Sequence, residues 1–340
     1  MSVQTESGSA KKLTRKDFKT DQDVRWCPGC GDYAILAQVQ KVFPTLGVRK
    51  EDFAVISGIG CSSRFPYYMN TYGFHTIHGR APAFATGLKS TRPELSVWVI
   101  SGDGDGLSIG GNHLIHAIRR NIDINILLFN NQIYGLTKGQ YSPTSEVGKR
   151  TKSTPMGSID EPFRPLSVAL GAEATFVART ADREQKHLAE TLKAAHAHKG
   201  TSFVEIFQNC NIFNDGAFFH VTEKGTKAAN QLNIEHGQPL LFSGEEMGVV
   251  FEGFTPKVVN VADVGLDAIS VHDETGDVGY HMALARLRAP EFPTALGILR
   301  RVERPTYDEM INAQVEVDRD KRGRGELRRL IEGPEPWTVG

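Results

Sequence analysis

The sequence has no long apolar run and no excess of one charge. No stretch approaches the roughly 20 apolar residues that a membrane-spanning helix needs, and residues 1–20 are polar, without the apolar centre of a signal peptide. The 39 Lys and Arg residues nearly balance the 40 Asp and Glu residues, so the formal net charge of −1 offers no argument for nucleic-acid binding. We therefore expect a cytoplasmic globular protein that binds neither membranes nor nucleic acids.

Cysteine is also scarce, with four residues among 340: Cys27, Cys30, Cys61 and Cys210. A large chain without an export signal is not expected to use them as structural disulfides. Pro28-Gly29 between Cys27 and Cys30 favours a tight bend that lets two thiolates converge on one metal. Four thiolates could bind one zinc ion or one 4Fe–4S cluster. The spacing alone leaves zinc, a cluster, a redox pair and unrelated thiols open.

Three segments in the middle of the chain predict one βαβ unit. An apolar run over residues 95–100 precedes Gly102-Asp103-Gly104-Asp105-Gly106, a helical pattern covers residues 107–120, and a second apolar run over residues 122–129 ends in Asn130-Asn131. Such runs are typical of strands buried in a parallel sheet. Because ligands bind beyond the carboxyl ends of these strands, the unit predicts a doubly wound, mainly parallel α/β sheet with a ligand site at the polar residues.

The polar residues at the two predicted strand ends suit a metal-bound diphosphate. Asp103 offers a carboxylate and Asn131 an amide oxygen, which are ligands that Mg²⁺ accepts together with phosphate oxygens. The glycines around Asp103 would let a diphosphate approach the backbone closely. A generic glycine turn would explain Gly-Asp-Gly alone, but not the ordered strand, helix, strand and Asn pair around it.

This spacing resembles the diphosphate-binding motif of thiamin diphosphate enzymes. In that family the aspartate of Gly-Asp-Gly and the second Asn of the pair hold Mg²⁺, and a backbone carbonyl two residues later, here that of Ile133, completes the protein ligands. Residues 132–140, Gln-Ile-Tyr-Gly-Leu-Thr-Lys-Gly-Gln, are also similar to one branch of the family, the β subunits of 2-oxoacid:ferredoxin oxidoreductases. The resemblance covers roughly residues 20–225, and it implies that the four cysteines ligate one 4Fe–4S cluster.

The resemblance also implies a set of residues around the thiamin diphosphate. Glycines at 58 and 60 suggest close backbone approach to a ligand, and Ser62 offers a hydroxyl donor. The His78-Gly79-Arg80 segment lies near the thiamin site in the resembling family, although His78 could equally be a buried histidine with satisfied hydrogen bonds. The expected cofactor-binding residues are Ile59, Gly60, Cys61, Ser62, His78, Gly102, Gly104, Asp105, Gly135, Leu136 and Thr137.

Two cationic residues are candidates for binding a second carboxylate of the substrate. A guanidinium such as that of Arg64 binds a carboxylate through two parallel hydrogen bonds, and Lys138 could reach a carboxylate or a coenzyme A phosphate. A surface ion pair for Arg64 and a solvated side chain for Lys138 are the simpler interpretations. With His78, these residues form the expected catalytic group.

The function that the resemblance implies is the coenzyme A-dependent oxidative decarboxylation of a 2-oxoacid, with electrons passing through the cluster to ferredoxin. The two cationic candidates favour 2-oxoglutarate over pyruvate. The resemblance also implies an α subunit that carries the aminopyrimidine-binding domain, in a heterodimer or heterotetramer. A pyruvate-type substrate, a non-redox thiamin diphosphate decarboxylase with structural zinc, and an assembly subunit without catalysis remain as alternatives.

The expected organisation has three parts. Residues 1–20 form a flexible N-terminal arm, residues 21–225 the domain that binds thiamin diphosphate, Mg²⁺ and the iron–sulfur cluster, and residues 226–340 a peripheral C-terminal extension that contacts a partner. Within the extension, the sequence predicts short strands over residues 243–250 and 257–264.

Overall fold

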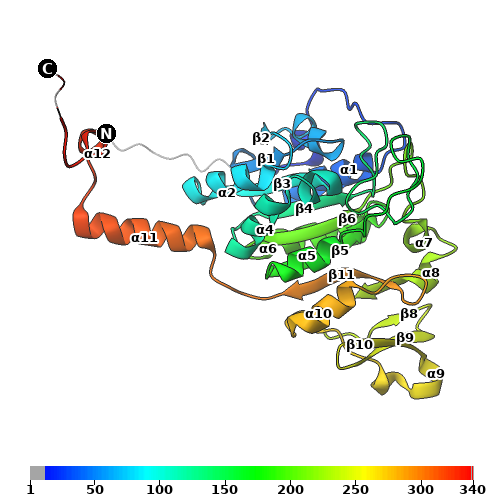
Figure 1. Cartoon of the computed structure of the whole chain (residues 1–340). Coiled ribbons are helices and arrows are strands. Elements are labelled where there is room, and N and C mark those ends of the chain that lie inside the picture. Colours follow the sequence, from blue (N-terminus) through cyan, green and yellow to red (C-terminus); the bar gives the residue numbers. More distant parts are fainter. Residues whose placement is uncertain (1–11, 338, 340) are drawn as a thin grey trace.

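The computed structural model describes residues 12–337 and 339, and an eight-stranded sheet forms its centre (Figure 1). In spatial order the strands are β2 (Tyr72–His75), β1 (Phe53–Ser57), β3 (Ser96–Gly102), β4 (Asn125–Asn130), β6 (Ser202–Phe207), β5 (Phe176–Ala181), β11 (Thr294–Arg301) and β7 (Gln231–Ile234). The first six strands run parallel to one another, whereas β11 is antiparallel to β5 and parallel to β7. The predicted mainly parallel sheet is therefore confirmed.

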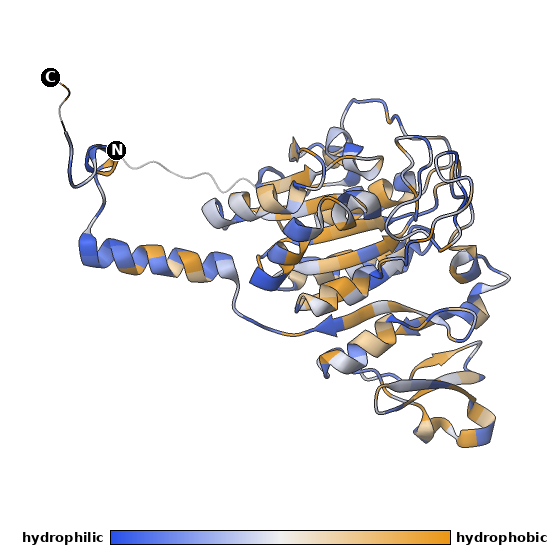
Figure 2. Ribbon diagram, in the orientation of Figure 1, coloured by the Kyte–Doolittle hydropathy of each residue, from blue (hydrophilic) through white to orange (hydrophobic). Residues whose placement is uncertain are grey.

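Helices cover both faces of the sheet, as a doubly wound fold requires. One face packs against α2 (Ala81–Thr91), α4 (Gly111–Arg120) and α5 (Pro165–Gly171), and the other against α1 (Asp32–Val42) and α6 (Gln185–Ala197). Alternate residues of each central strand enter the two cores: Val97 and Val99 enter one, and Trp98 and Ile100 the other. Burial on both faces explains why these strands appear as continuous apolar runs in the sequence and as hydrophobic ribbons in Figure 2.

The helix predicted over residues 107–120 corresponds to the second of two helices in this region. The first, α3 (Asp103–Leu107), begins inside the Gly-Asp-Gly motif, and α4 follows after a break. The break has a steric reason at Gly110. A Cβ atom at Gly110 would lie 2.4 Å from the carbonyl oxygen of Asp105, and one at Gly79 would lie 2.5 Å from the nitrogen of Gly110. The loop that carries His78 thus packs directly on this break.

The region after residue 225 does not lie wholly outside the main sheet, because it supplies β7 and β11. It also forms a small antiparallel sheet of β8 (Leu241–Phe242), β9 (Met247–Glu252) and β10 (Thr255–Asn260). The strands predicted over residues 243–250 and 257–264 are therefore shifted, and the second ends where a helix begins. The region's helices are α8 (Lys227–Asn230), α9 (Val261–Val264), α10 (Val278–Ala285), α11 (Tyr307–Arg322) and α12 (Leu327–Glu332). In Figure 1, α11 and α12 project away from the sheet.

Short helical segments complete the fold. They are α7 (Phe219–Thr222) and the 3-10 helices Arg15–Phe18, Phe43–Thr45, Lys50–Asp52, Ser62–Tyr68 and Leu266–Ala268. Residues 1–11 of the predicted N-terminal arm lie outside the described residues. The rest of the predicted arm is anchored, because Phe18 is buried with its ring centroid 5.7 Å from Phe43 and 5.6 Å from Phe53. No helix in the described part of the chain has the length and apolar character needed to cross a membrane.

The strand order places four loops together. Because β1, β3, β4 and β6 are parallel neighbours, the loops that follow them leave the sheet at the same edge. These loops carry the Gly-rich segment after Ser57, the Gly-Asp-Gly motif, the Asn pair and Cys210.

Candidate active site

Asp103 lies at the start of α3 and is almost completely buried. Its Oδ2 atom accepts hydrogen bonds from the hydroxyl groups of Ser142 and Thr144, each at 2.5 Å. Burial raises the pKa of Asp103 to about 6 despite these bonds. No Lys or Arg in the described part of the chain forms an ion pair with this carboxylate. A buried carboxylate in this state gains stability from a cation at its side.

Asp105, two residues later, holds neighbouring loops together. Its carboxylate accepts hydrogen bonds from the backbone N–H groups of Ile59 at 3.0 Å and Gly79 at 2.7 Å, and from the Ser101 hydroxyl at 2.6 Å. The Nδ1 atom of His78 lies 2.7 Å from the same carboxylate. Asp105 thus holds the backbone at Ile59 and Gly79 against the Gly-Asp-Gly motif, with the His78 ring close by, and the carboxylate's contacts are with the protein itself.

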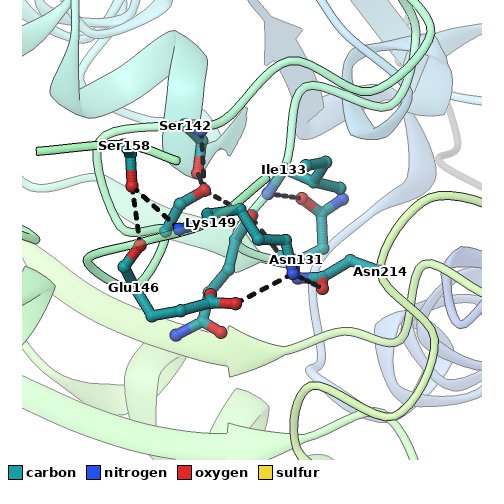
Figure 3. A network of polar contacts seen from close by, with 9 residues as sticks. Asn131, Ile133, Ser142, Glu146, Lys149, Ser158 and Asn214 are labelled. Atoms are coloured by element: carbon teal, nitrogen blue, oxygen red, sulfur yellow. Dashed lines mark hydrogen bonds and ion pairs between the residues drawn. The ribbon is translucent and has the colours of Figure 1, made fainter. Parts of the chain in front are cut away.

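The Asn131–Ile133 turn is held by one hydrogen bond within the turn and by others from Gln208 and Asn214; Figure 3 shows the contacts with Ile133 and Asn214. The Asn131 side-chain oxygen accepts a hydrogen bond from the Ile133 N–H at 3.1 Å, and its amide group donates to Gln208 at 2.8 Å. The Asn214 amide donates to the Asn131 carbonyl at 2.9 Å. Lys149 in turn donates to the Asn214 side-chain oxygen at 2.5 Å. The turn that carries two predicted Mg²⁺ ligands is therefore rigidly supported.

One cavity of about 100 Å³ lies at this edge of the sheet. All the residues predicted to bind the cofactor line it, together with the predicted Mg²⁺ ligands Asp103, Asn131 and Ile133 and with Tyr134, which the sequence did not single out. Small residues are required here, because a Cβ atom at Gly58 would lie 2.0 Å from the Asp105 carboxylate and one at Gly104 would lie 2.2 Å from the Tyr134 ring. The structure thus brings the predicted cofactor residues together.

The four cysteines line a second cavity, of about 180 Å³. A Cβ atom at Gly135 would lie 3.5 Å from the sulfur atoms of both Cys61 and Cys210, so these two thiols flank one glycine. Burial, and then the nearby Asp32 carboxylate, raises the pKa of Cys61 to about 12, and the same two causes raise the pKa of Cys30. Among the described residues, no three or more His, Cys, Asp or Glu side chains form a group suited to a single metal ion.

The two cavities are neighbours with a common wall. Cys61, Asn131, Gly135 and Leu136 line both of them. A group held by the four cysteines and a cofactor held by the Gly-Asp-Gly loop would therefore lie close to each other.

The structure places the three predicted catalytic residues in different cavities. His78 lines the Gly-Asp-Gly cavity, whereas Arg64 and Lys138 line the cysteine cavity. Arg64 is half-buried and donates from Nε to the Tyr68 hydroxyl at 3.2 Å, and within the described residues it makes no ion pair with a carboxylate. Lys138 is exposed. The surface ion pair considered as the simpler interpretation of Arg64 is therefore not observed among the described residues.

Comparison with known proteins defines the family. Residues 58–206 match the family model described as the C-terminal TPP binding domain of thiamine pyrophosphate enzymes. The 2-oxoglutarate oxidoreductase subunit KorB of Mycobacterium tuberculosis is 56% identical over 329 residues, which cover 95% of this chain and 88% of that protein. The 2-oxoacid:ferredoxin oxidoreductase subunit beta of Saccharolobus solfataricus is 41% identical over 225 residues, which cover 65% of this chain and 73% of that protein. This chain belongs to the 2-oxoacid:ferredoxin oxidoreductase β subunits.

A solved structure agrees with this assignment. The chain is similar to a chain of the 2-oxoglutarate:ferredoxin oxidoreductase from Magnetococcus marinus, solved with 2-oxoglutarate, coenzyme A and succinyl-CoA bound, with a TM-score of 0.76 and 34% sequence identity over 96% of this chain and 97% of that one. The predicted family and fold class are therefore confirmed, and the family model supports thiamin diphosphate as the cofactor. As a β subunit, the protein is one part of a multi-subunit oxidoreductase.

Sequence reasoning missed the residues that support the predicted ligands. These are Ser142 and Thr144 beside Asp103, and Gln208 and Asn214 beside Asn131. Residues 131–164 lack helical or strand periodicity, so no pattern there distinguished a supporting hydroxyl from a solvated one. Asn214 starts an Asn-Asp-Gly turn, and a turn alone explains an Asn at this position. The sequence therefore gave no reason to assign it a further role.

Proposed function

We propose that this chain, together with an α subunit, catalyses the coenzyme A-dependent oxidative decarboxylation of 2-oxoglutarate in the cytoplasm and passes the electrons to ferredoxin. The observation that carries the proposal is the common wall between the Gly-Asp-Gly cavity and the cysteine cavity. The relatives from Mycobacterium tuberculosis and Methanocaldococcus jannaschii are both named as subunits of 2-oxoglutarate enzymes. These names support 2-oxoglutarate rather than pyruvate as the substrate.

Asp103, the Asn131 side chain and the Ile133 carbonyl would hold Mg²⁺ together with the diphosphate of thiamin diphosphate. The residues suit this role because Asp103 is a buried carboxylate that no Lys or Arg of the described residues pairs with, and because hydrogen bonds fix the Asn131 amide. When bound, thiamin diphosphate supplies the nucleophilic carbon and the electron sink for decarboxylation. The protein would position the diphosphate, and His78 lies beside Asp105 in the lining of the same cavity.

Cys27, Cys30, Cys61 and Cys210 would ligate one 4Fe–4S cluster. The cavity that they line, of about 180 Å³, offers more room than one zinc ion fills at a Zn–S distance of about 2.3 Å. Burial disfavours the thiolate forms of Cys30 and Cys61, and bound iron would reverse that preference. The neighbouring thiamin cavity suits one-electron transfer from cofactor to cluster.

The Cys210→Ser variant is expected to lose most of its iron and its electron transfer, because a serine oxygen is a poor ligand for this cluster. The measurement is iron and zinc content per chain after anaerobic purification, with the visible absorbance of the cluster. Wild-type protein should contain about four iron atoms per chain. Full iron occupancy and activity in Cys210→Ser, or zinc in place of iron in the wild type, would contradict the proposed cluster.

The Arg64→Ala variant is expected to raise the KM for 2-oxoglutarate about tenfold to a hundredfold, because hydrogen bonds to a charged group contribute about 1.5–3 kcal/mol. Its effect on 2-oxobutyrate, which lacks the second carboxylate, should be much smaller. Arg64→Lys is the matched variant, since it keeps the charge but loses the bidentate geometry. Its KM for 2-oxoglutarate should lie between those of the wild type and Arg64→Ala. Equal losses for both substrates would remove Arg64 from this role.

A further inference from the structure

Gln208 lies between the two cavities and contacts a residue of each. It follows β6 directly, and its side chain is buried, with 1% of the residue exposed. The Oε1 atom accepts a hydrogen bond from the Asn131 amide at 2.8 Å, and the Nε2 atom donates to the Cys30 sulfur at 3.3 Å. One side chain thus joins a proposed Mg²⁺ ligand to a proposed cluster ligand.

The orientation of the Gln208 amide follows from its neighbours. The Asn131 side-chain oxygen already accepts from the Ile133 N–H, so the Asn131 amide nitrogen must face Gln208. Gln208 therefore turns its oxygen toward Asn131. Its nitrogen, with two hydrogens, then donates to the Asn209 carbonyl at 2.7 Å and to the Cys30 sulfur. A flipped amide would leave two nitrogens facing each other and a carbonyl facing a thiolate.

We infer that Gln208 is a positioning residue with two effects: it orients the Asn131 oxygen toward the metal, and it donates the N–H···S hydrogen bond that sets the reduction potential of the cluster. The inference rests on the proposed function, because it requires both bound groups. Removal of a group that holds a metal ligand in place commonly weakens metal binding. A hydrogen bond to a cluster sulfur stabilises the reduced cluster, because reduction adds negative charge. The bond therefore raises the reduction potential.

Two substitutions separate these effects. Gln208→Leu removes both the acceptor and the donor. It is expected to weaken Mg²⁺-dependent binding of thiamin diphosphate about tenfold to a hundredfold and to shift the cluster potential to a more negative value. Gln208→Glu keeps an oxygen for the Asn131 amide but has no N–H for Cys30, and it adds a negative charge beside the sulfur. It should therefore keep cofactor affinity within a few-fold of wild type while lowering the potential further.

The matched control is Gln231→Leu. Gln231 is also a buried glutamine, and it donates to the Val221 carbonyl at 3.2 Å from β7, at the edge of the sheet away from β1 and β3. This variant makes the same chemical change without contact to either cavity. Cofactor affinity and cluster potential should both remain at the wild-type values.

The test uses the full chain with its partner subunit, purified anaerobically. Calorimetry measures thiamin diphosphate affinity in the presence of Mg²⁺, and a redox titration followed by electron paramagnetic resonance measures the cluster potential. If wild type builds both sites and neither Gln208 variant differs from Gln231→Leu in either quantity, the inference is overturned while the proposed function stands. If wild type builds no cluster, the proposed function falls and this inference falls with it.

Discussion

The Asp103→Ala variant is expected to lose measurable Mg²⁺-dependent binding of thiamin diphosphate while keeping its fold. The loss follows because Asp103, at the carboxyl end of β3, lines the same cavity as Asn131 and has no ion pair with any Lys or Arg in the described part of the chain. Mg²⁺ takes few protein ligands in such sites, so the removal of the one anionic ligand leaves two neutral oxygens from Asn131 and Ile133. Activity of the assembled enzyme should fall to background.

The fold should tolerate this change because the partners of Asp103 have other partners. The Ser142 and Thr144 hydroxyl groups lie 3.2 Å apart, and the Thr144 hydroxyl lies 3.0 Å from the Asn130 side-chain oxygen, to which it can donate its one hydrogen once Asp103 is gone. Burial raises the pKa of Asp103 to about 6, which means that the ionised form is less favoured there than in water. Its removal therefore relieves a desolvation cost, and the thermal midpoint should change by only a few degrees.

The measurement is calorimetric titration of the full chain with thiamin diphosphate and Mg²⁺. Asp308→Ala is the matched control, because Asp308 is an equally buried carboxylate that accepts from the Asp123 N–H, just before β4 and at the opposite end of that strand from Asn131. The control should bind the cofactor as wild type does. Unchanged affinity in Asp103→Ala would show that the Gly-Asp-Gly aspartate does not hold the metal.

The location of the candidate site could be predicted because it depends on sheet geometry. In parallel neighbours, the residues that end each strand lie side by side: Gly102 pairs with Phe129, and Asn130 with Phe207. The Gly-Asp-Gly motif, the Asn pair and the segment leading to Cys210 therefore meet, because β3, β4 and β6, which precede them, are neighbouring parallel strands. Their position at the strand ends is enough to identify these polar residues as candidates for the site.

The supporting contacts could not be predicted, since they depend on how loops without periodicity pack. In the sequence, Gln208 looks like any polar residue that follows a strand. Its contacts with Asn131 and Cys30 appear only in the folded chain, because both partners come from distant segments. The same holds for the break before α4, which the packing of Gly79 on Gly110 imposes. These features come from tertiary contacts that a single sequence does not display.

The strands β7 and β11 were missed for a different reason. The strand β7 has four residues, one of them exposed, and β11 changes register near Ile298, so neither shows a long regular pattern. Both become strands because the edge of β5 supplies a partner for β11, which in turn supplies one for β7. Pairing with an existing sheet edge thus overrides a weak local signal.

This chain is expected to have no turnover without its α subunit. The Gly-Asp-Gly cavity, of about 100 Å³, is smaller than the roughly 300 Å³ or more of typical small-molecule sites. It therefore suits the diphosphate and its metal rather than the whole cofactor. Thiamin enzymes enclose the cofactor between two domains, and the described part of the chain contains one large α/β sheet with a small three-stranded sheet beside it.

Exposed apolar side chains lie in and beside the loops that form the cavity, where we expect the second domain to dock. Ile77 is 70% exposed, Ile109 54% and Leu136 44%, and all three lie in the loops that carry or touch the predicted cofactor residues. Such exposure next to a binding site is typical of a surface that a partner covers. An obligate interface of this kind buries on the order of 2,000 Å² or more.

The test compares the full chain alone, with its cluster reconstituted, with the complex of both subunits. Each receives Mg²⁺, thiamin diphosphate, 2-oxoglutarate and coenzyme A, and the reduction of a viologen dye is followed. The isolated chain should show only background reduction, because the glutamate that activates the aminopyrimidine belongs to the α subunit's domain in the resembling family. Addition of the α subunit should restore turnover, whereas an Asp103→Ala chain given the same subunit should stay inactive. Turnover of the isolated chain at the rate of the complex would mean that the activating glutamate lies within these 340 residues.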